Sequence, residues 1–323
     1  MCNIKVMNDN IDNKKLIVYR EDDFMYKTRG KLQYLQNKYA SDKLKHKSVS
    51  IINTGFKTID SNLKIRNGVY LIGGVPSVGK TSLILQLADN FAKQGKQVLF
   101  FSLEQSEYDL TRKSINRIQH ELNVTEEEAI KEYCKYAENI TTVTSHSLLT
   151  VEEIESIVKD YVTKMQVHPM IFVDYLQLIK TNEQMMRRDA ITYISNVLVN
   201  IVKRYQLPMF VLSALNRTNY LMPIDFESFK ESGSLEYDAD VVFGIQYALI
   251  EDDAFLEMTT ENKRKAMNEE KLKDIRKVDL ICIKNRFGRI VPKCELQYYT
   301  GMDWFVEQNE QMVGKLNKKV VRL

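Results

Sequence analysis

Short apolar runs alternate with amphipathic stretches along most of the chain. The apolar runs are typical of buried strands and cover residues 68–74, 97–104, 170–179 and 209–215. Between them, apolar residues recur at helical spacing, as they do from Ile154 to Met165. Strands that alternate with helices form parallel sheets covered by helices on both faces. The pattern therefore predicts an α/β fold with a mostly parallel, twisted sheet.

The last third of the chain has a different pattern. Two more apolar runs, 240–245 and 278–285, flank a highly charged stretch at residues 251–277. We expect the charged stretch to be an insertion made of a solvated loop and a helix. The following segment, VPKCELQYY, is expected to pair with its predecessor as a hairpin, which gives the sheet an antiparallel edge.

The pattern also divides the chain into three parts. Residues 1–47 are polar and lysine-rich, too short for a core of their own, and predict an N-terminal arm or linker helix. A frayed tail is the alternative for this part. Residues 48–300 form the predicted core domain. Residues 301–323 form a C-terminal tail, in which we expect no regular structure after Trp304.

Composition limits the class of protein. With 44% hydrophobic and 28% charged residues the chain has the balance of a soluble protein. It has no apolar run of membrane-spanning length and no signal-peptide character, so we expect a cytoplasmic protein without membrane contact. The net charge of +3 permits nucleic-acid binding without favouring it. The four cysteines are scattered, which indicates reduced, mostly buried thiols and no zinc site.

The first apolar run ends in the sequence GVPSVGKT, which matches the phosphate-binding pattern G-x-x-x-x-G-K-S/T at every fixed position. Glycines allow several backbone N–H groups to approach a phosphate chain, the lysine adds charge, and the hydroxyl can hold Mg²⁺. A helix that starts here adds its positive N-terminal end. The loop predicts nucleoside triphosphate binding by Gly74, Pro76, Ser77, Val78, Gly79, Lys80, Thr81 and Ser82.

Two acids follow predicted strands. Asp174 comes after the apolar run 170–173, and Glu104 closes the run 97–103. Acids at the carboxyl ends of strands lie where open α/β sheets bind ligands. Asp174 is therefore expected to support Mg²⁺, together with Thr81. Glu104 is expected either to orient the attacking water or to cap the next helix.

Cations cluster at a predicted turn around Gly288, namely Lys284, Asn285, Arg286 and Arg289 as the polar residues of that turn. They are either a solvated turn or a source of positive charge for a γ-phosphate, as in an arginine finger. At a sheet edge, such cations would serve a neighbouring subunit rather than their own.

The segments VPSVGKT, FFSLEQ, VDYLQL, LSALNR, ESGSLEYDADVV and IKNRFG occur in this order, and TGFKTID precedes them. Together they resemble the ATPase domain of DnaB-type replicative helicases, which has a RecA-like fold. The resemblance covers roughly residues 48–298. It implies ATP and Mg²⁺ as cofactors, catalytic roles for Glu104 and Lys80, and a ring-shaped homo-oligomer, a hexamer. It also implies that Lys284 and Arg286 reach the ATP of the adjacent subunit.

The resemblance further implies single-stranded DNA in the channel of the ring and other replication proteins as partners. The candidate DNA contacts lie after Asp174 and around residues 217–230: they are Arg187, Arg188, Arg217 and Lys230. Cations on loops suffice to contact phosphates. A solvated surface is the alternative for all of them.

Two departures from the family pattern shape the functional hypothesis. Ala214 stands where the family usually has a glutamine thought to sense the γ-phosphate, and only a short arm precedes the core. We expect a specialised relative that lacks the large N-terminal domain and acts as an ATP-hydrolysing DNA helicase in replication. A nucleotide-gated assembly or adaptor ATPase is the alternative, and a recombinase-like filament is a third.

Overall fold

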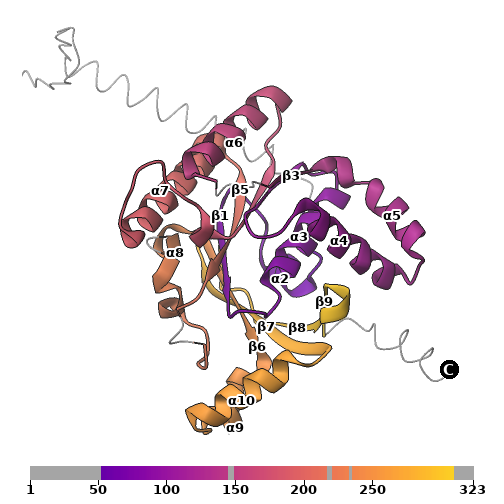
Figure 1. The fold of residues 1–323 in the computed structure, drawn as a ribbon, viewed down its shortest axis with the longest axis vertical. Coiled ribbons are helices and arrows are strands. Elements are labelled where there is room, and N and C mark those ends of the chain that lie inside the picture. The colour runs from indigo at the N-terminus through magenta and orange to yellow at the C-terminus, as the bar shows by residue number, and fades with distance from the viewer. Residues whose placement is uncertain (1–51, 145–148, 217–219, 233–234, 309–323) are drawn as a thin grey trace, which may run out of the picture. The chain divides into compact units, whose positions relative to one another are not determined.

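A sheet of nine strands forms the centre of the computed structural model, which describes residues 52–144, 149–216, 220–232 and 235–308 (Figure 1). The strand order is β3-β2-β4-β5-β1-β6-β7-β8-β9. The strands are β1 (Gly68–Gly74), β2 (Val98–Ser102), β3 (Ile140–Thr144), β4 (Met170–Asp174), β5 (Pro208–Ala214), β6 (Val241–Tyr247), β7 (Ile275–Asn285), β8 (Cys294–Tyr299) and β9 (Trp304–Glu307). Strands β1 to β6 pair in parallel, and β7 to β9 join as antiparallel strands. The predicted α/β sheet with an antiparallel edge is confirmed.

Helices cover both faces of the sheet, with α6, α7 and α8 on one side and α2 to α5 on the other (Figure 1). Their bounds are α2 (Lys57–Asn62), α3 (Lys80–Lys93), α4 (Glu107–Leu122), α5 (Glu126–Cys134), α6 (Val151–Met165), α7 (Arg187–Tyr205), α8 (Leu235–Asp238), α9 (Asp253–Leu256) and α10 (Thr260–Lys271). Capping boxes at Thr125 and Thr150 begin α5 and α6, because each threonine hydroxyl and a glutamate three residues later satisfy free backbone N–H groups.

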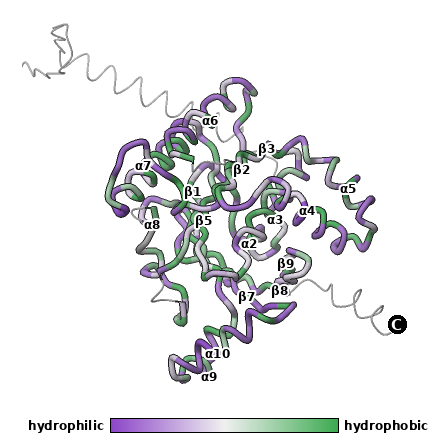
Figure 2. The backbone as a smooth tube through the Cα atoms, in the orientation of Figure 1, coloured by the Kyte–Doolittle hydropathy of each residue, from purple (hydrophilic) through white to green (hydrophobic). Residues whose placement is uncertain are grey.

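A row of aromatic rings fixes the register of the parallel strands. Tyr70, Phe210, Phe172 and Phe100 are paired in sequence across β1, β5, β4 and β2. Their rings stack with centroid distances of 4.6, 4.9 and 5.7 Å. Phe91 of α3 packs on the row at 5.6 Å from Phe210. Hydrophobic positions gather along these central strands, whereas α10 is largely hydrophilic (Figure 2).

Two elements differ from the prediction. Strand β4 ends at Asp174, and the rest of the apolar run turns into a 3₁₀ turn, η2 (Leu176–Leu178). At the other end, β9 (Trp304–Glu307) forms where no structure is expected, because its order comes from distant contacts. The Phe305 ring stacks on Tyr298 at 4.2 Å, and its backbone exchanges two hydrogen bonds with the side chain of Gln86.

The charged stretch after residue 251 forms α9 and α10, as expected. Strand β7 begins at Ile275, so the end of that stretch belongs to the sheet. Residues 1–47 and the tail beyond 308 lie outside the described residues, and the predicted domain limits stay a prediction.

The described residues include no helix with the length and apolar character needed to cross a membrane. Of the cysteines in this part of the chain, Cys282 and Cys294 are buried and Cys134 is exposed; all three are free thiols. Burial raises the pKa of the two buried thiols, which keeps them protonated and unreactive. Cys2 lies outside the described residues.

We expect Phe305→Ala to lower the free energy of unfolding by about 3–5 kcal/mol, the usual cost of truncating a buried phenylalanine. The Phe305 side chain is 1% exposed and supports both the sheet edge and α3. Urea unfolding followed by circular dichroism measures the change. The control is Val306→Ala, a neighbouring truncation at a half-buried position, which should cost less. Equal losses in the two variants would show that β9 contributes little to the fold.

Candidate functional site

The loop after β1 has the geometry that a phosphate chain requires. Ser77 and Gly79 have positive φ angles of 64° and 99°, which turn successive N–H groups toward one side. A Cβ on Gly79 would lie 2.8 Å from the rings of Tyr298 and Phe305. The loop therefore rests directly on the aromatic stack of β8 and β9. Glycine is needed at 79 both for its backbone conformation and for this close approach.

The backbone carbonyl of Ser77 is held from the other side. Tyr247 donates its hydroxyl to this carbonyl at 3.1 Å, and the Arg276 guanidinium donates to it at 2.7 Å. Arg276 also donates to the backbone carbonyl of Lys273 at 3.2 Å, just after α10. The loop is thus fixed by residues from β6 and β7 that are far away in sequence.

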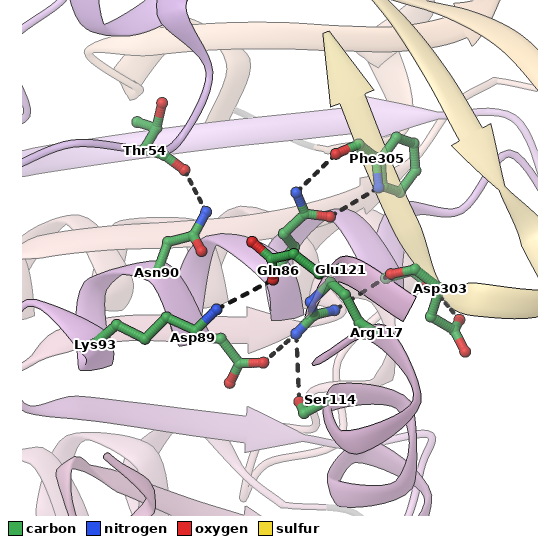
Figure 3. A network of polar contacts seen from close by, with 11 residues as sticks. Thr54, Gln86, Asp89, Asn90, Lys93, Ser114, Arg117, Glu121, Asp303 and Phe305 are labelled. Carbon is green, nitrogen blue, oxygen red and sulfur yellow. Dashed lines mark hydrogen bonds and ion pairs between the residues drawn. The ribbon is translucent and has the colours of Figure 1, made fainter. Parts of the chain in front are cut away.

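Helix α3 starts in the loop and is fixed along its length by polar contacts (Figure 3). Gln86 bonds to the backbone of Phe305, and Asn90 donates to the carbonyl of Thr54 at 2.8 Å. Asp89 forms a buried ion pair with Arg117 of α4. A buried pair of this kind is costly to break, because removal of one partner leaves a buried charge. The helix therefore keeps its N-terminus in place against the loop.

Lys80 and Thr81, the first residues of α3, point toward the acids of the neighbouring strands. The Lys80 Nζ donates to the carbonyls of Gly74 and Val75 at 2.9 and 3.0 Å. The Thr81 hydroxyl donates to Asp174 Oδ2 at 2.7 Å. Burial raises the pKa of Asp174 to about 6, Glu104 adds to the rise, and the Thr81 hydrogen bond and Lys80 oppose it.

Glu104 reaches this group because of the strand register. Ser102 of β2 pairs with Asp174 of β4, and Glu104 follows two residues later. Glu104 lies close enough for its charge to act on both Lys80 and Asp174. It is exposed, as a group that orients water for hydrolysis needs to be. The structure thus brings all four predicted chemical side chains together.

These residues line a cavity of about 480 Å³. Its lining comprises Pro76, Ser77, Gly79, Lys80, Thr81, Ser82, Glu104, Gln105, Lys113, Asp174, Tyr175, Ala214 and Tyr298. Gly74 and Val78, two further predicted cofactor-binding residues, lie buried beneath the loop. The Ser82 hydroxyl donates to Asp303 at 2.6 Å, so its backbone remains as the group that can face a ligand.

The sequence analysis missed several residues of this cavity. Lys113 of α4 adds a second cation and forms an ion pair with Asp303 at 2.7 Å. Tyr298 comes from β8, about two hundred residues after the loop. Gln177 bonds to the Ser213 hydroxyl at 2.9 Å, and its side-chain oxygen accepts the backbone N–H of Ala214. No sequence pattern marks these residues, because tertiary packing alone brings them to the site.

A divalent cation fits the acids that are present. The described residues contain no group of three or more His, Cys, Asp or Glu side chains that could hold a metal on their own. Mg²⁺ is usually held by one or two carboxylates together with phosphate oxygens and water. The Thr81 hydroxyl and Asp174 match that requirement.

Lys284 and Arg286 lie at the opposite edge of the sheet from the cavity. The Arg286 N–H bonds to the carbonyl of Asp240, whose own N–H bonds to Val69 at the start of β1. The five residues from Val69 to Gly74 span roughly 16 Å at the usual rise of about 3.3 Å per residue. The two cations are therefore unable to reach the phosphate loop of their own chain.

The structure places only part of the predicted DNA contacts. Arg187 and Arg188 are exposed at the start of α7, after β4. Burial, Glu104 and Asp174 raise the pKa of Tyr175, whereas the nearby charge of Arg187 lowers it. Arg187 thus lies close to the cavity edge. Arg217 and the side chain of Lys230 lie outside the described part of the structure.

The fold and the site define the class of P-loop proteins: a glycine-rich loop joins a buried parallel strand to a helix, and an acid ends a strand of the same sheet. A model of the family described as DnaB-like helicase C terminal domain matches residues 51–307. The chain belongs to this family.

Curated relatives match over part of their length. The replicative DNA helicase DnaB of Buchnera aphidicola (subsp. Baizongia pistaciae) is 29% identical over 219 residues, which cover 62% of this chain and 47% of the relative. The DnaB of Mycoplasma genitalium is 28% identical over 293 residues, covering 80% and 57%. The chain thus spans about half the length of the curated relatives it matches.

Solved structures confirm the predicted RecA-like fold. An ATPase domain superposes with a TM-score of 0.67 at 21% identity, over 85% of this chain and 97% of that chain. A DnaB-like replicative helicase, described with its interactions with primase, superposes with a TM-score of 0.65 at 21% identity, over 83% of this chain and 66% of that chain.

The affinity for a nucleoside triphosphate should depend on pH through Lys80. Burial lowers the pKa of this amine to about 8, against the attraction of Asp174 and Glu104. A bound phosphate chain favours the charged amine, so binding above that pH takes up a proton. We expect the affinity to fall by up to about tenfold per pH unit above about pH 8. Equilibrium binding of a fluorescent triphosphate analogue across this range measures the effect.

The matched control for this titration is Lys80→Arg, because a guanidinium keeps its charge throughout. Its affinity should not vary over the same range. An equal decline in both proteins would assign the pH dependence to another group.

Proposed function

We propose that the chain is the ATP-hydrolysing motor of a DnaB-like DNA helicase, which moves along single-stranded DNA as a ring in DNA replication. The observation that carries this proposal is the separation of two halves of one catalytic centre to opposite edges of the sheet. Lys80, Thr81 and Glu104 lie at one edge, and Lys284 and Arg286 lie at the other. Each half needs a second copy of the chain to complete it.

In this proposal ATP binds with its phosphates along the loop, where Lys80 neutralises charge. Mg²⁺ binds to the Thr81 hydroxyl, with Asp174 behind it as the supporting acid. Glu104 orients the attacking water, because it is exposed and lies beside both groups. Lys284 and Arg286 stabilise the charge that develops on the γ-phosphate of the neighbouring subunit.

Single-stranded DNA is the proposed partner at the carboxyl edge. Arg187 and Arg188 are exposed where α7 begins, and the segment after β5 leaves the sheet next to them, because β4 and β5 are adjacent parallel strands. Cations at this place can track a phosphate backbone without reading its sequence. Other replication proteins are further proposed partners, by analogy with the solved helicase that interacts with primase.

Shared sites can be tested by mixing two inactive variants. Arg286→Ala should bind ATP normally but hydrolyse it on the order of a thousandfold more slowly, which is the usual effect of losing an arginine finger. Lys80→Ala should lose turnover at its own loop while it keeps both cations. Mixed subunits should regain part of the ATPase rate, since intact loops then meet intact cations.

The control for the mixing test is Arg289→Ala, which removes an exposed cation from the same turn and should leave the rate unchanged. If the mixture stays as inactive as its components, the cations serve no neighbouring site and the proposed ring mechanism fails.

Unwinding distinguishes the motor from an adaptor ATPase. We expect the full chain to separate a forked DNA duplex in the presence of ATP and Mg²⁺, and Lys80→Ala to leave the fork intact. A strand-displacement gel measures the separated strand. ATP hydrolysis that proceeds without any strand separation would favour the adaptor.

A further inference from the structure

After β5 the chain crosses the face of the sheet from the carboxyl edge to the amino edge. We name residues 220–232 and 235–240 the crossing segment. Near the carboxyl edge, Phe229 packs so closely on Gly73 that a Cβ there would lie 2.3 Å from its ring. At the amino edge, Asp240 bonds to the backbone of β1. The segment thus links the proposed DNA side of the sheet to the side that carries the cations.

The far end of the crossing segment holds both cations. Lys284 Nζ donates to the carbonyl of Tyr237 and, at 3.3 Å, to that of Glu236. Arg286 donates to the carbonyls of Tyr237 at 2.7 Å and Asp238 at 3.0 Å. The Tyr237 carbonyl therefore accepts hydrogen bonds from both side chains. Any movement of Tyr237 changes the position of the two cations together.

The ring of Tyr237 contacts the near end of the segment. It packs edge-on against Phe226, with the ring centroids 5.2 Å apart and the planes at 69°. Phe226 is the first residue of the 3₁₀ turn η4 (Phe226–Ser232). Tyr237 itself is 63% exposed, so this aromatic pair is a main constraint on the position of its ring.

Phe226 is in turn tied to the end of β5. The Asp225 carboxylate accepts hydrogen bonds from the Ser228 N–H and hydroxyl, both at 2.9 Å, and this closes the turn around Phe226. The carbonyl of Ser228 accepts the N–H of Asn216 at 2.9 Å. Asn216 follows β5 directly, so a displacement of the chain there is passed to η4.

We propose that Phe226 and Tyr237 are positioning residues that couple DNA beside β5 of one subunit to the placement of Lys284 and Arg286 at the neighbour's triphosphate. The inference rests on the proposed function and adds a route through which DNA controls hydrolysis. The route runs through two rings and one shared carbonyl. It leaves the DNA contacts and the phosphate loop themselves unchanged.

The side chains and the carbonyl have separate tasks, which makes the proposal testable. Truncation of either ring leaves the carbonyl acceptors of α8 in the backbone, so the cations keep their hydrogen bonds. What is lost is the link between η4 and α8. The expected effect is therefore a loss of control by DNA, with no loss of basal turnover.

The test measures the ATPase rate of the full chain with and without an oligothymidine strand. For Phe226→Ala we expect the DNA-free kcat, the KM for ATP and the Kd for the strand to stay unchanged. The stimulation by DNA should fall roughly two- to tenfold, the range that an aromatic pair can supply. Tyr237→Ala should behave in the same way. The double variant should be no worse than the single ones, because both remove one link.

Two controls separate coupling from general damage. Tyr237→Phe keeps the ring contact and should retain full stimulation. In mixtures, Lys80→Ala subunits carry the intact route but no turnover. Adding them to Phe226→Ala subunits should restore stimulation at the active sites, because the route acts on the neighbour.

Each failure has a distinct meaning. If the unsubstituted chain shows no ATPase activity or no stimulation by DNA, the proposed function fails before the inference is reached. If that stimulation exists and Phe226→Ala keeps all of it, the inference alone is overturned. A raised Kd with full stimulation at saturating DNA would make Phe226 a DNA contact and would also overturn it.

Discussion

Parallel pairing of the central strands is the constraint on which the rest of this structure depends. Because β1, β2, β4 and β5 run in one direction, their carboxyl ends meet at one edge, and the register sets Gly74 beside Ala214 and Ser102 beside Asp174. The loop, the metal-binding acid and Glu104 therefore meet without any local sequence signal that joins them. Strand β7 runs the other way, so its carboxyl end delivers the cations to the opposite edge.

The antiparallel edge also supports the phosphate loop. The stack of Tyr298 and Phe305 lies under Gly79, while Tyr247 and Arg276 hold the carbonyl of Ser77. These contacts fix a backbone that has positive φ angles and would otherwise be strained. Burial at the site shifts the pKa of Lys80 down and that of Asp174 up, so the fold keeps charged groups where their solvation is poor. Such arrangements cost stability and are typical of sites prepared for a charged ligand.

Local patterns predicted the elements that their own residues determine. The buried strands, the helices with regular apolar spacing and the phosphate loop follow from the sequence in this way. Strand β9 does not, because its order comes from the contacts of Phe305 with Tyr298 and Gln86. Lys113 and Tyr298 escaped notice for the same reason, since they reach the cavity only through packing. The early end of β4 was missed because the apolar residues after Asp174 continue the run, although the backbone turns there.

The position of the two half-sites limits how copies of the chain can associate. A twofold pair uses the same surface of both partners, so it would have to bring the cavity edge and the cation edge into one patch. The strand length separates Arg286 from the loop of its own chain by roughly 16 Å along β1 alone, which prevents this arrangement. A complete site therefore needs head-to-tail contact, in which the cation edge of one copy meets the cavity edge of the next. Repetition of that contact gives a closed ring or an open helix, and in both every nucleotide lies between two subunits.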